Sequence, residues 1–209
     1  MYQPAHHDVT DLAVLHDLIE AHPFGTWATA PDGVLEMNHI PFLLDRAKGP
    51  QGTLIGHVAR VNPVWQHAST SIVAFHGPQA YITPNWYPSK HAQGKAVPTW
   101  NYAVVQAHGQ PRAIEDKAKL LQVLRHLTNA HEARQALPWS VSDAPADYID
   151  ALLAAIVGIE IPIERLVGKW KVSQNRPAAD RLGVVAGLTG SDEAQASAMA
   201  ALVQQFAPK

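Results

Sequence analysis

The chain has 209 residues, 47% hydrophobic and 16% charged, which suits one large globular domain or one domain with small appendages. It contains no cysteine, which excludes disulfides, thiolate catalysis, iron–sulfur clusters and cysteine-type zinc sites. Sixteen basic and eighteen acidic residues give a net charge of −2, so the chain lacks the basic surplus of a nucleic-acid-binding protein and direct DNA binding is doubtful.

The N-terminal sequence MYQPAHHDVTD has neither a basic segment nor an apolar segment of the kind found in secretion signals. No apolar run approaches the roughly 18 residues that a membrane span needs. These features predict a cytoplasmic protein without a membrane anchor.

The first half of the chain predicts one helix followed by short strands. Leucine and isoleucine recur at helical spacing between Asp11 and Ala21, with Thr10 as a candidate N-cap and Pro23 as the stop. The turn sequence Pro31-Asp32-Gly33 then separates two strand-like runs, as in a β-hairpin. The predicted strands are 24–30, 34–44, 54–60, 71–76 and 99–108. Because almost no helices separate them, an antiparallel barrel or sandwich is favoured over a parallel sheet.

The second half adds helices and returning strands. We predict helices over 115–130 and 146–157, strands over 159–167 and 169–173, and helices over 177–182 and 192–206. We find no internal repeat and no linker, so residues 1–209 are predicted to form one α+β domain. Residues from about 177 to 209 form its helical tail.

One segment, residues 77–102, concentrates polar-edged aromatic residues among prolines. Its aromatic residues are Tyr81, Trp86, Tyr87, Trp100 and Tyr102. Such side chains on stiff backbone can stack on a flat heteroaromatic ligand while neighbouring amides and hydroxyls bind its edge. The alternative is a packed corner of a β-barrel with hydrogen-bonded Tyr and Trp tips.

Four blocks of sequence resemble one known family. They are Tyr2–His6, Gly56–Pro63 (GHVARVNP), Pro98–Tyr102 (PTWNY) and Gly168–Arg176 (GKWKVSQNR). They are similar to the PaiB-type FMN-binding split-barrel proteins, often described as negative transcriptional regulators and related to the pyridoxamine 5'-phosphate oxidase-like flavoproteins. The resemblance extends from Met1 to about Leu188.

The resemblance implies an antiparallel six-stranded split β-barrel with peripheral helices, a homodimer, and FMN at the subunit interface. It does not specify a reaction, because one fold hosts many activities. One position departs from the family pattern, since Val61 stands where alanine is usual and leaves less room near the site.

Side-chain chemistry suggests a role for each candidate FMN-binding residue. A guanidinium such as that of Arg60 can bind the phosphate with two parallel hydrogen bonds, and the basic Lys171–Arg176 segment can add to it. Trp86, Trp100 and Tyr102 can form the ring wall, although Trp100 also suits a core position. The other candidates are His57, Asn62, Thr99, Asn101, Lys171, Ser173, Gln174, Asn175 and Arg176. For Arg176, an alternative is an ion pair with Asp180.

No catalytic residue can be named from the sequence. The GxGxxG, GxxxxGK[ST], HExxH and GxSxG motifs are absent, and none of the twelve histidines are spaced as metal-ligand pairs, so no metal site is predicted. His57 lies three residues before Arg60 and suits either a strand-bridging role or a hydrogen bond to a flavin edge. His39 has a simpler interpretation as a residue of the barrel wall.

Three functions are compatible with these observations. The first is an FMN-dependent oxidoreductase or a flavin-linked regulator, with small-molecule flavin as the ligand. The second is a negative transcriptional regulator that acts on DNA or through a protein partner, although no helix-turn-helix signature is present. The third is a haem-binding split-barrel protein, for which the sequence identifies no axial ligand.

Overall fold

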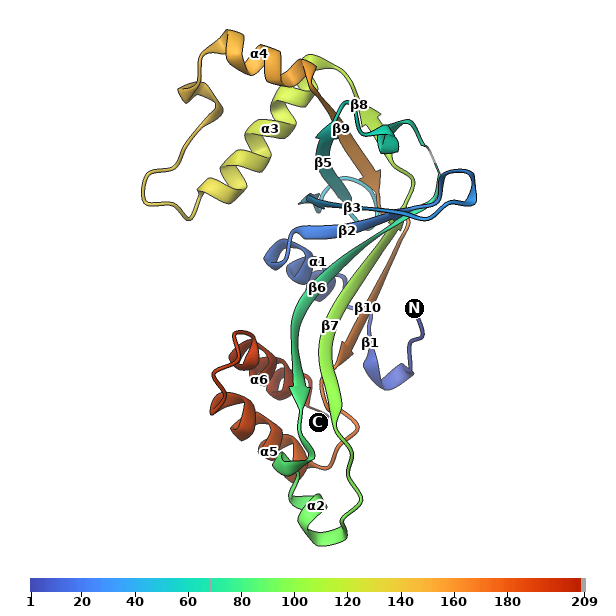
Figure 1. The fold of residues 1–209 in the computed structure, drawn as a ribbon, viewed down its shortest axis with the longest axis vertical. Helices are drawn as coiled ribbons and strands as arrows, with labels where there is room; N and C mark the ends of the chain where they lie inside the picture. The colour runs from blue at the N-terminus through green and yellow to red at the C-terminus, as the bar shows by residue number, and fades with distance from the viewer. Residues whose placement is uncertain (68, 208–209) are drawn as a thin grey trace. The chain divides into compact units, whose positions relative to one another are not determined.

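The computed structural model describes residues 1–67 and 69–207 (Figure 1). Within those residues, ten β-strands form a six-stranded and a four-stranded sheet, and six α-helices accompany them. The strand pairs β1–β10, β2–β3, β2–β6, β4–β5, β5–β9 and β8–β9 all run antiparallel. The predicted α+β class with antiparallel sheets is therefore confirmed.

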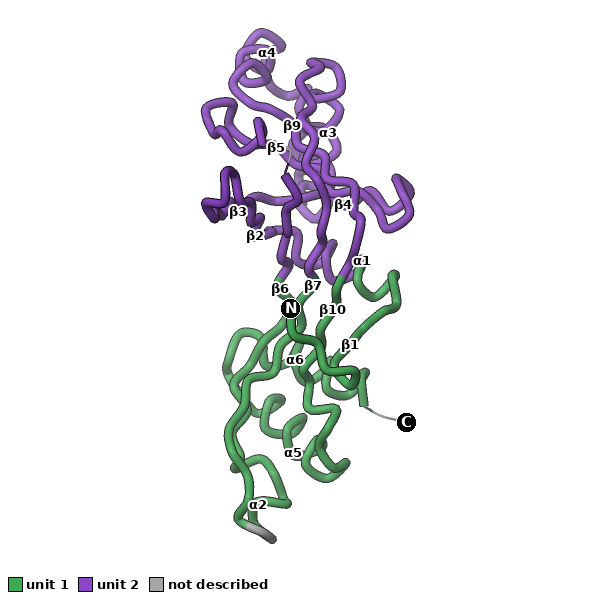
Figure 2. Tube along the Cα trace, turned by 90° about the vertical axis from the view of Figure 1, so that its right-hand side faces the viewer, with its two compact units in different colours: residues 1–15, 76–105, 167–209 green, residues 16–75, 106–166 purple. Residues whose placement is uncertain are grey.

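The chain divides into two compact units, shown in different colours in Figure 2. Unit 1 comprises residues 1–15, 76–105 and 167–209, and unit 2 comprises residues 16–75 and 106–166. Three strands contribute residues to both units: β6 (Ser71–Ile82), β7 (Thr99–Gly109) and β10 (Arg165–Lys171). That the whole chain behaves as one domain stays a prediction.

Unit 2 contains the predicted hairpin. Strands β2 (Phe24–Thr29) and β3 (Glu36–Pro41) pair in register, with Thr29 opposite Glu36. The turn between them forms because Asp32 (φ 50°) and Gly33 (φ 81°) adopt left-handed conformations that Asp tolerates and Gly favours. The strand order is β6-β2-β3, and a second sheet has the order β4-β5-β9-β8. Its strands are β4 (Leu43–Asp45), β5 (Thr53–Ala59), β9 (Ile156–Pro162) and β8 (Arg112–Ile114).

Two apolar clusters stabilise unit 2. Trp27 and Phe42 are buried with their rings edge to face and centroids 6.4 Å apart, and Phe75 continues the contact at 6.1 Å from Phe42. A second cluster joins α3 (Lys117–Glu132) to α4 (Ala146–Ala154) through Leu120, Val141, Ile149 and Leu153. Helix α1 spans Leu12–Ala21, as its leucine spacing predicts.

Unit 1 is a sheet with helices packed against it. Its strand order is β1-β10-β7-β6, with β1 (Asp8–Val9) pairing with Gly168 and Lys169. Helices α5 (Ala178–Thr189) and α6 (Ala196–Gln205) pack together beside β6 in Figure 1. The buried Trp170 of β10 lies 5.9 Å from the ring of Phe206, which anchors the tail. Helix α5 is longer than predicted because Val184 and Leu188 continue its buried face.

Several predicted boundaries are wrong. The helix predicted over 146–157 ends at Ala154, and Val157 instead pairs with Val58 in β9, since β-branched residues favour strands. The strand predicted over 159–167 is divided, with β9 ending at Pro162 and β10 beginning at Arg165, because proline cannot donate to a strand ladder. The run 34–44 likewise forms two strands, and β6 extends to Ile82. The sequence analysis did not predict β1, β8 or the short helix α2 (Pro88–Gln93).

The tail is fixed by close packing of α5 on the segment that holds Trp86. A methyl group added at Gly183 would lie 1.9 Å from the carbonyl oxygen of Trp86. We predict that Gly183→Ala lowers the free energy of unfolding by about 1–3 kcal/mol, although Ala favours helix by about 1 kcal/mol over Gly. Urea unfolding measures the difference.

The matched control is Gly190→Ala, at the end of the same helix. There the added methyl would lie 3.6 Å from the carbonyl oxygen of Ala186, an ordinary van der Waals contact, so stability should be unchanged or slightly increased. Equal stability of Gly183→Ala and the parent protein would contradict the close packing of α5 on this segment.

Candidate functional site

Two lysines on β10 lie at the centre of a polar network in unit 1. Lys169 and Lys171 are two residues apart, so their side chains leave the strand on the same side. The Lys171 ammonium donates hydrogen bonds to the Thr99 hydroxyl and, at 2.9 Å, to the Trp100 carbonyl. Lys169 is buried, donates to the Tyr2 carbonyl at 2.9 Å, and lies 5.6 Å from the ring centroids of both Tyr2 and Tyr102.

These lysines and Arg176 form a cluster of positive charge, here called the cation cluster (Lys169, Lys171 and Arg176). Burial lowers the pKa of Lys171. The interaction with Tyr102 raises this pKa, whereas the neighbouring charges of Lys169 and Arg176 lower it further. The ion pairs among the described residues include none of the three. An anion bound here would supply the missing opposite charge.

The turn after β10 is held by buried polar contacts. Ser173 adopts a left-handed conformation (φ 64°), which is strained for a residue with a side chain. Its hydroxyl accepts a hydrogen bond from the side-chain amide of the buried Asn101 at 3.0 Å. The Gln174 side-chain oxygen accepts from the Val172 backbone at 2.8 Å and lies 3.1 Å from Nδ1 of His7. These bonds fix the direction in which the chain continues to Arg176.

An exposed aromatic face lies beside this network. The Trp100 side chain is 49% exposed, and its ring contacts Tyr81 edge to face with centroids 6.2 Å apart. Its indole nitrogen donates to the Gln79 side chain at 3.0 Å, which fixes the ring orientation. A shallow cavity of about 170 Å³ adjoins it, lined by His76, Gly77, Gln79, Trp100, Tyr102, Ala103 and Val104.

The remaining candidates of unit 1 have different surroundings. The Arg176 guanidinium lies 4.7 Å from the ring centroid of Tyr87, while Asn175 is exposed. Trp86 packs on α5, where a methyl group at Gly187 would lie 2.2 Å from its ring. The structure therefore gives Trp86 a packing role in the tail.

In unit 2, Arg60 joins the end of β5 to the end of α4. Its Nε donates to the carbonyl of Ala154 at 3.0 Å, and its two terminal nitrogens donate at 3.1 Å to the carbonyl of Ile156 and to the Glu115 carboxylate. A guanidinium has five N–H donors, so these bonds leave two for a ligand. The side chain is 38% exposed, which keeps those donors accessible.

The other two unit 2 candidates, Asn62 and His57, differ in whether their polar side-chain atoms have hydrogen-bond partners. The Asn62 side chain accepts from the Val64 backbone at 3.0 Å and donates to Asn38 at 2.7 Å, so it caps the short helical turn that follows. His57 is half-buried, and its Nδ1 is buried with no hydrogen-bond partner among the described residues. Burial lowers the pKa of His57, which favours the neutral ring.

The structure thus brings seven of the predicted residues into one network and gives the others different surroundings. Thr99, Trp100, Asn101, Tyr102, Lys171, Ser173 and Gln174 belong to the unit 1 network, whereas His57, Arg60 and Asn62 belong to unit 2. The candidate FMN-binding residues did not include Lys169, Tyr2, His7 and Gln79, and Tyr81 was named only within the aromatic segment 77–102. The two-residue spacing of Lys169 and Lys171 was the available signal for Lys169, whereas the contacts of Tyr2 and His7 arise only from the fold.

Comparison with known proteins identifies the family. Residues 1–165 match the model of the family described as "Putative FMN-binding domain". The chain belongs to this family. An uncharacterized protein of Emericella nidulans is 36% identical over 225 residues, covering 90% of each chain. The Protease synthase and sporulation protein PAI 2 of Bacillus subtilis is 29% identical over 207 residues, covering 98% of this chain and 97% of its own. Recognition of the PaiB-type family and of FMN as its cofactor is confirmed.

Solved structures support the fold. A flavocytochrome from Azotobacter vinelandii has a TM-score of 0.57 at 12% identity, covering 78% of this chain and 69% of its own. The FAD and heme binding protein from Mycobacterium smegmatis has a TM-score of 0.55 at 17% identity, covering 78% and 73%. The predicted split-barrel fold with peripheral helices is therefore confirmed. None of the described helices is both long and apolar enough to span a membrane.

The unit 1 network fits an FMN-binding family member. A phosphate monoester needs charged donors, which the cation cluster supplies, and an isoalloxazine ring needs an apolar face, which Trp100 and Tyr81 supply. The buried and unpartnered Nδ1 of His57 is a second feature of the kind that a polar ligand would satisfy. Bound FMN would supply hydride or electron transfer.

The lowered pKa of His57 predicts how stability depends on pH. In the unfolded chain the imidazole regains a pKa near 6.5, whereas burial keeps the folded value below it. Between these values the unfolded state binds a proton that the folded state resists, so the free energy of unfolding falls as the pH drops from 7 towards 5. We predict a smaller acid-induced loss of Tm in His57→Gln than in the parent protein.

Calorimetry between pH 5 and 7.5 measures both slopes. Identical slopes would show that His57 contributes nothing to the acid sensitivity. An NMR titration of the ring is the direct control, and a pKa at or above 6.5 would contradict the effect of burial.

Proposed function

We propose that this family member is a flavin-dependent oxidoreductase or flavin-linked regulator that binds the FMN phosphate at the cation cluster. The supporting observation is Lys171, a partly buried ammonium near the charges of Lys169 and Arg176. Among the described residues, its hydrogen bonds go only to the neutral oxygens of Thr99 and Trp100. A structural lysine would be expected to pair with a carboxylate, and none contacts it among the described residues. A dianionic phosphate beside it would relieve the repulsion within the cluster.

In this proposal the flavin ring packs on the exposed aromatic face formed by Trp100 and Tyr81. Trp100 is exposed, held in orientation by Gln79, and continuous in the chain with Thr99 and Asn101. The lysine that would bind the phosphate donates to the Trp100 carbonyl, so the phosphate and ring sites lie on the neighbouring strands β10 and β7. The protein would then supply position and charge, and FMN would supply the redox chemistry.

A regulatory role is the second candidate. It is favoured by 29% identity to the Bacillus subtilis Protease synthase and sporulation protein PAI 2 over nearly the whole of both chains. In that case the redox state of the bound flavin would control contact with a partner. Both roles require the same flavin site, so the site is the first thing to test.

The phosphate site predicts a difference between two flavins. Lys171→Ala should weaken FMN binding by about 10- to 150-fold, which corresponds to the roughly 1.5–3 kcal/mol of a charge-assisted hydrogen bond. Riboflavin lacks the phosphate, so its affinity should hardly change. Fluorescence titration of the apoprotein with each flavin measures both constants, with the exposed Lys95→Ala as the matched control.

Equal losses for FMN and riboflavin would show that the variant disturbs the ring site or the fold instead. Arg60→Ala is tested in the same way, because two of its N–H donors are free for a phosphate. A selective loss of FMN in Arg60→Ala alone would assign the phosphate to unit 2 and overturn the cation-cluster proposal.

We also propose a homodimer. Unit 2 exposes apolar side chains on the β2–β3 hairpin and after β5, here called the apolar patch (Phe24, Val34, Leu35, Met37 and Val61), which are 62% to 92% exposed. The strand β3 that carries Met37 is an edge strand of its sheet, and exposed apolar edges mark association sites. The shallow cavity beside Trp100 encloses about 170 Å³, less than the roughly 300 Å³ at the lower end of ligand sites, so further enclosure is needed around a flavin.

The patch predicts which substitutions dissociate the dimer. The parent protein should sediment as a dimer at micromolar concentration, with an interface of about 2,000 Å² or more in total. Leu35→Glu should shift it towards monomer, because a charge at this position would be buried without a partner. Leu182→Glu is the control, since Leu182 is 70% exposed but lies on α5 in unit 1. A monomeric parent protein would contradict the proposal.

A further inference from the structure

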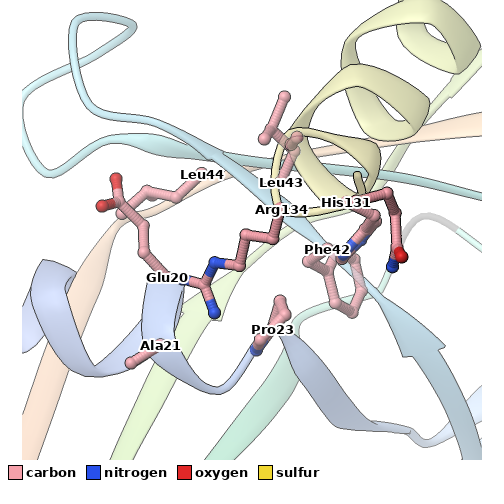
Figure 3. A pocket seen from close by; sticks show the side chains of 10 residues that line it. Glu20, Ala21, Pro23, Phe42, Leu43, Leu44, His131 and Arg134 are labelled. Carbon is pink, nitrogen blue, oxygen red and sulfur yellow. The ribbon is translucent and has the colours of Figure 1, made fainter. Parts of the chain in front are cut away.

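A pocket in unit 2 is lined by none of the residues assigned to flavin above. It has a volume of about 410 Å³ and is bounded by the end of α1, the start of β4 and the end of α3 (Figure 3). Its volume falls within the range of small-molecule sites, about 300–1,000 Å³. Its lining residues are Glu20, Ala21, Pro23, Phe42, Leu43, Leu44, Ala130, His131, Arg134 and Gln135.

The lining combines an apolar floor with a few polar groups. Six of the ten residues are apolar, and the polar ones are Glu20, His131, Arg134 and Gln135. In Figure 3, Arg134 extends from the end of α3 towards Glu20 and Pro23, and His131 lies beside the ring of Phe42. A pocket that combines apolar side chains with a few polar groups is a common form of site for an organic ligand.

The charged groups of the pocket differ in their partners. Both carboxylate oxygens of Glu20 accept hydrogen bonds from Arg46 at 2.7 Å, and the same guanidinium also pairs with Asp17 at 2.7 Å. Arg134 takes part in none of the ion pairs of the described residues. The pocket therefore presents a guanidinium that has no ion-pair partner among the described residues, together with apolar side chains.

We propose that this pocket binds a compact organic carboxylate with a flat apolar body. The carboxylate would accept two parallel hydrogen bonds from Arg134, the geometry that a guanidinium favours. The flat body would pack against Pro23 and the apolar edge of the β4 segment. His131 and Gln135, which also line the pocket, supply further donors.

The site is independent of the proposed flavin site. None of its residues belongs to the cation cluster, to the aromatic face or to the set His57, Arg60 and Asn62. Loss of flavin binding would therefore not remove carboxylate binding, and the two proposals can fail separately.

The test uses indole-3-acetate and its uncharged amide, indole-3-acetamide, as probes of the FMN-loaded protein. Amide-resolved NMR titration should show saturable shifts for the acid, centred on Ala21, Leu43 and His131. The amide should bind about tenfold or more weakly, because it lacks the charge that Arg134 recognises. Arg134→Ala should reduce affinity for the acid by a similar factor, and Arg134→Lys by less.

Arg125→Ala is the matched control, an exposed arginine on α3 that does not line the pocket. It should leave the affinity for the acid unchanged, and circular dichroism should show that both variants stay folded. The proposal is overturned if the acid shows no saturation up to about 10 mM, if acid and amide bind equally, or if Arg125→Ala matches Arg134→Ala.

Discussion

The alternation of side chains along β10 is the constraint on which unit 1 depends. Trp170 is buried against Phe206 on one side of the strand, which ties the helical tail to the sheet. Lys169 and Lys171, one residue before and one after it, leave the strand on the other side and meet Tyr102 and Thr99. One short strand thus sets both the packing of the tail and the position of the positive charge. A shift of one residue in its pairing would turn the lysines towards Phe206 and Trp170 towards Tyr102 and Thr99.

The elements that the sequence predicted well are those with a strong local cause. The hairpin of β2 and β3 follows from Pro31-Asp32-Gly33, and α1 follows from its leucine spacing. Errors arose where local preference and tertiary pairing disagree: Val157 continues an apolar helical pattern, yet pairs with Val58 in β9. The two-residue strand β1 has too little sequence to show a period and exists because β10 provides it with an edge.

The residues of the candidate site also differ in how far the sequence could predict their roles. Lys171, Ser173 and Asn101 were predicted from residue type within family-like blocks, and the structure joins them through hydrogen bonds between distant segments. Trp86 has the same residue type as Trp100, yet it packs on glycines of α5 while Trp100 stays half exposed. Whether a tryptophan lines a site or fills a groove depends on what lies opposite it, which residue type does not specify. Family membership identifies FMN as the cofactor, and the contacts within each unit suggest which side chains would hold it.

The low net charge and the basic cluster are consistent with each other. A single phosphate monoester carries at most two negative charges, and three cations on one strand and its turn are sufficient to bind it. A DNA duplex presents about one charge every 1.7 Å, so binding to it needs a long basic surface. With 16 basic against 18 acidic residues, concentrating three cations at one site leaves the rest of the chain more acidic still. The same charge distribution that favours a flavin phosphate therefore disfavours direct contact with DNA, and flavin-linked regulation in this protein would act through a partner.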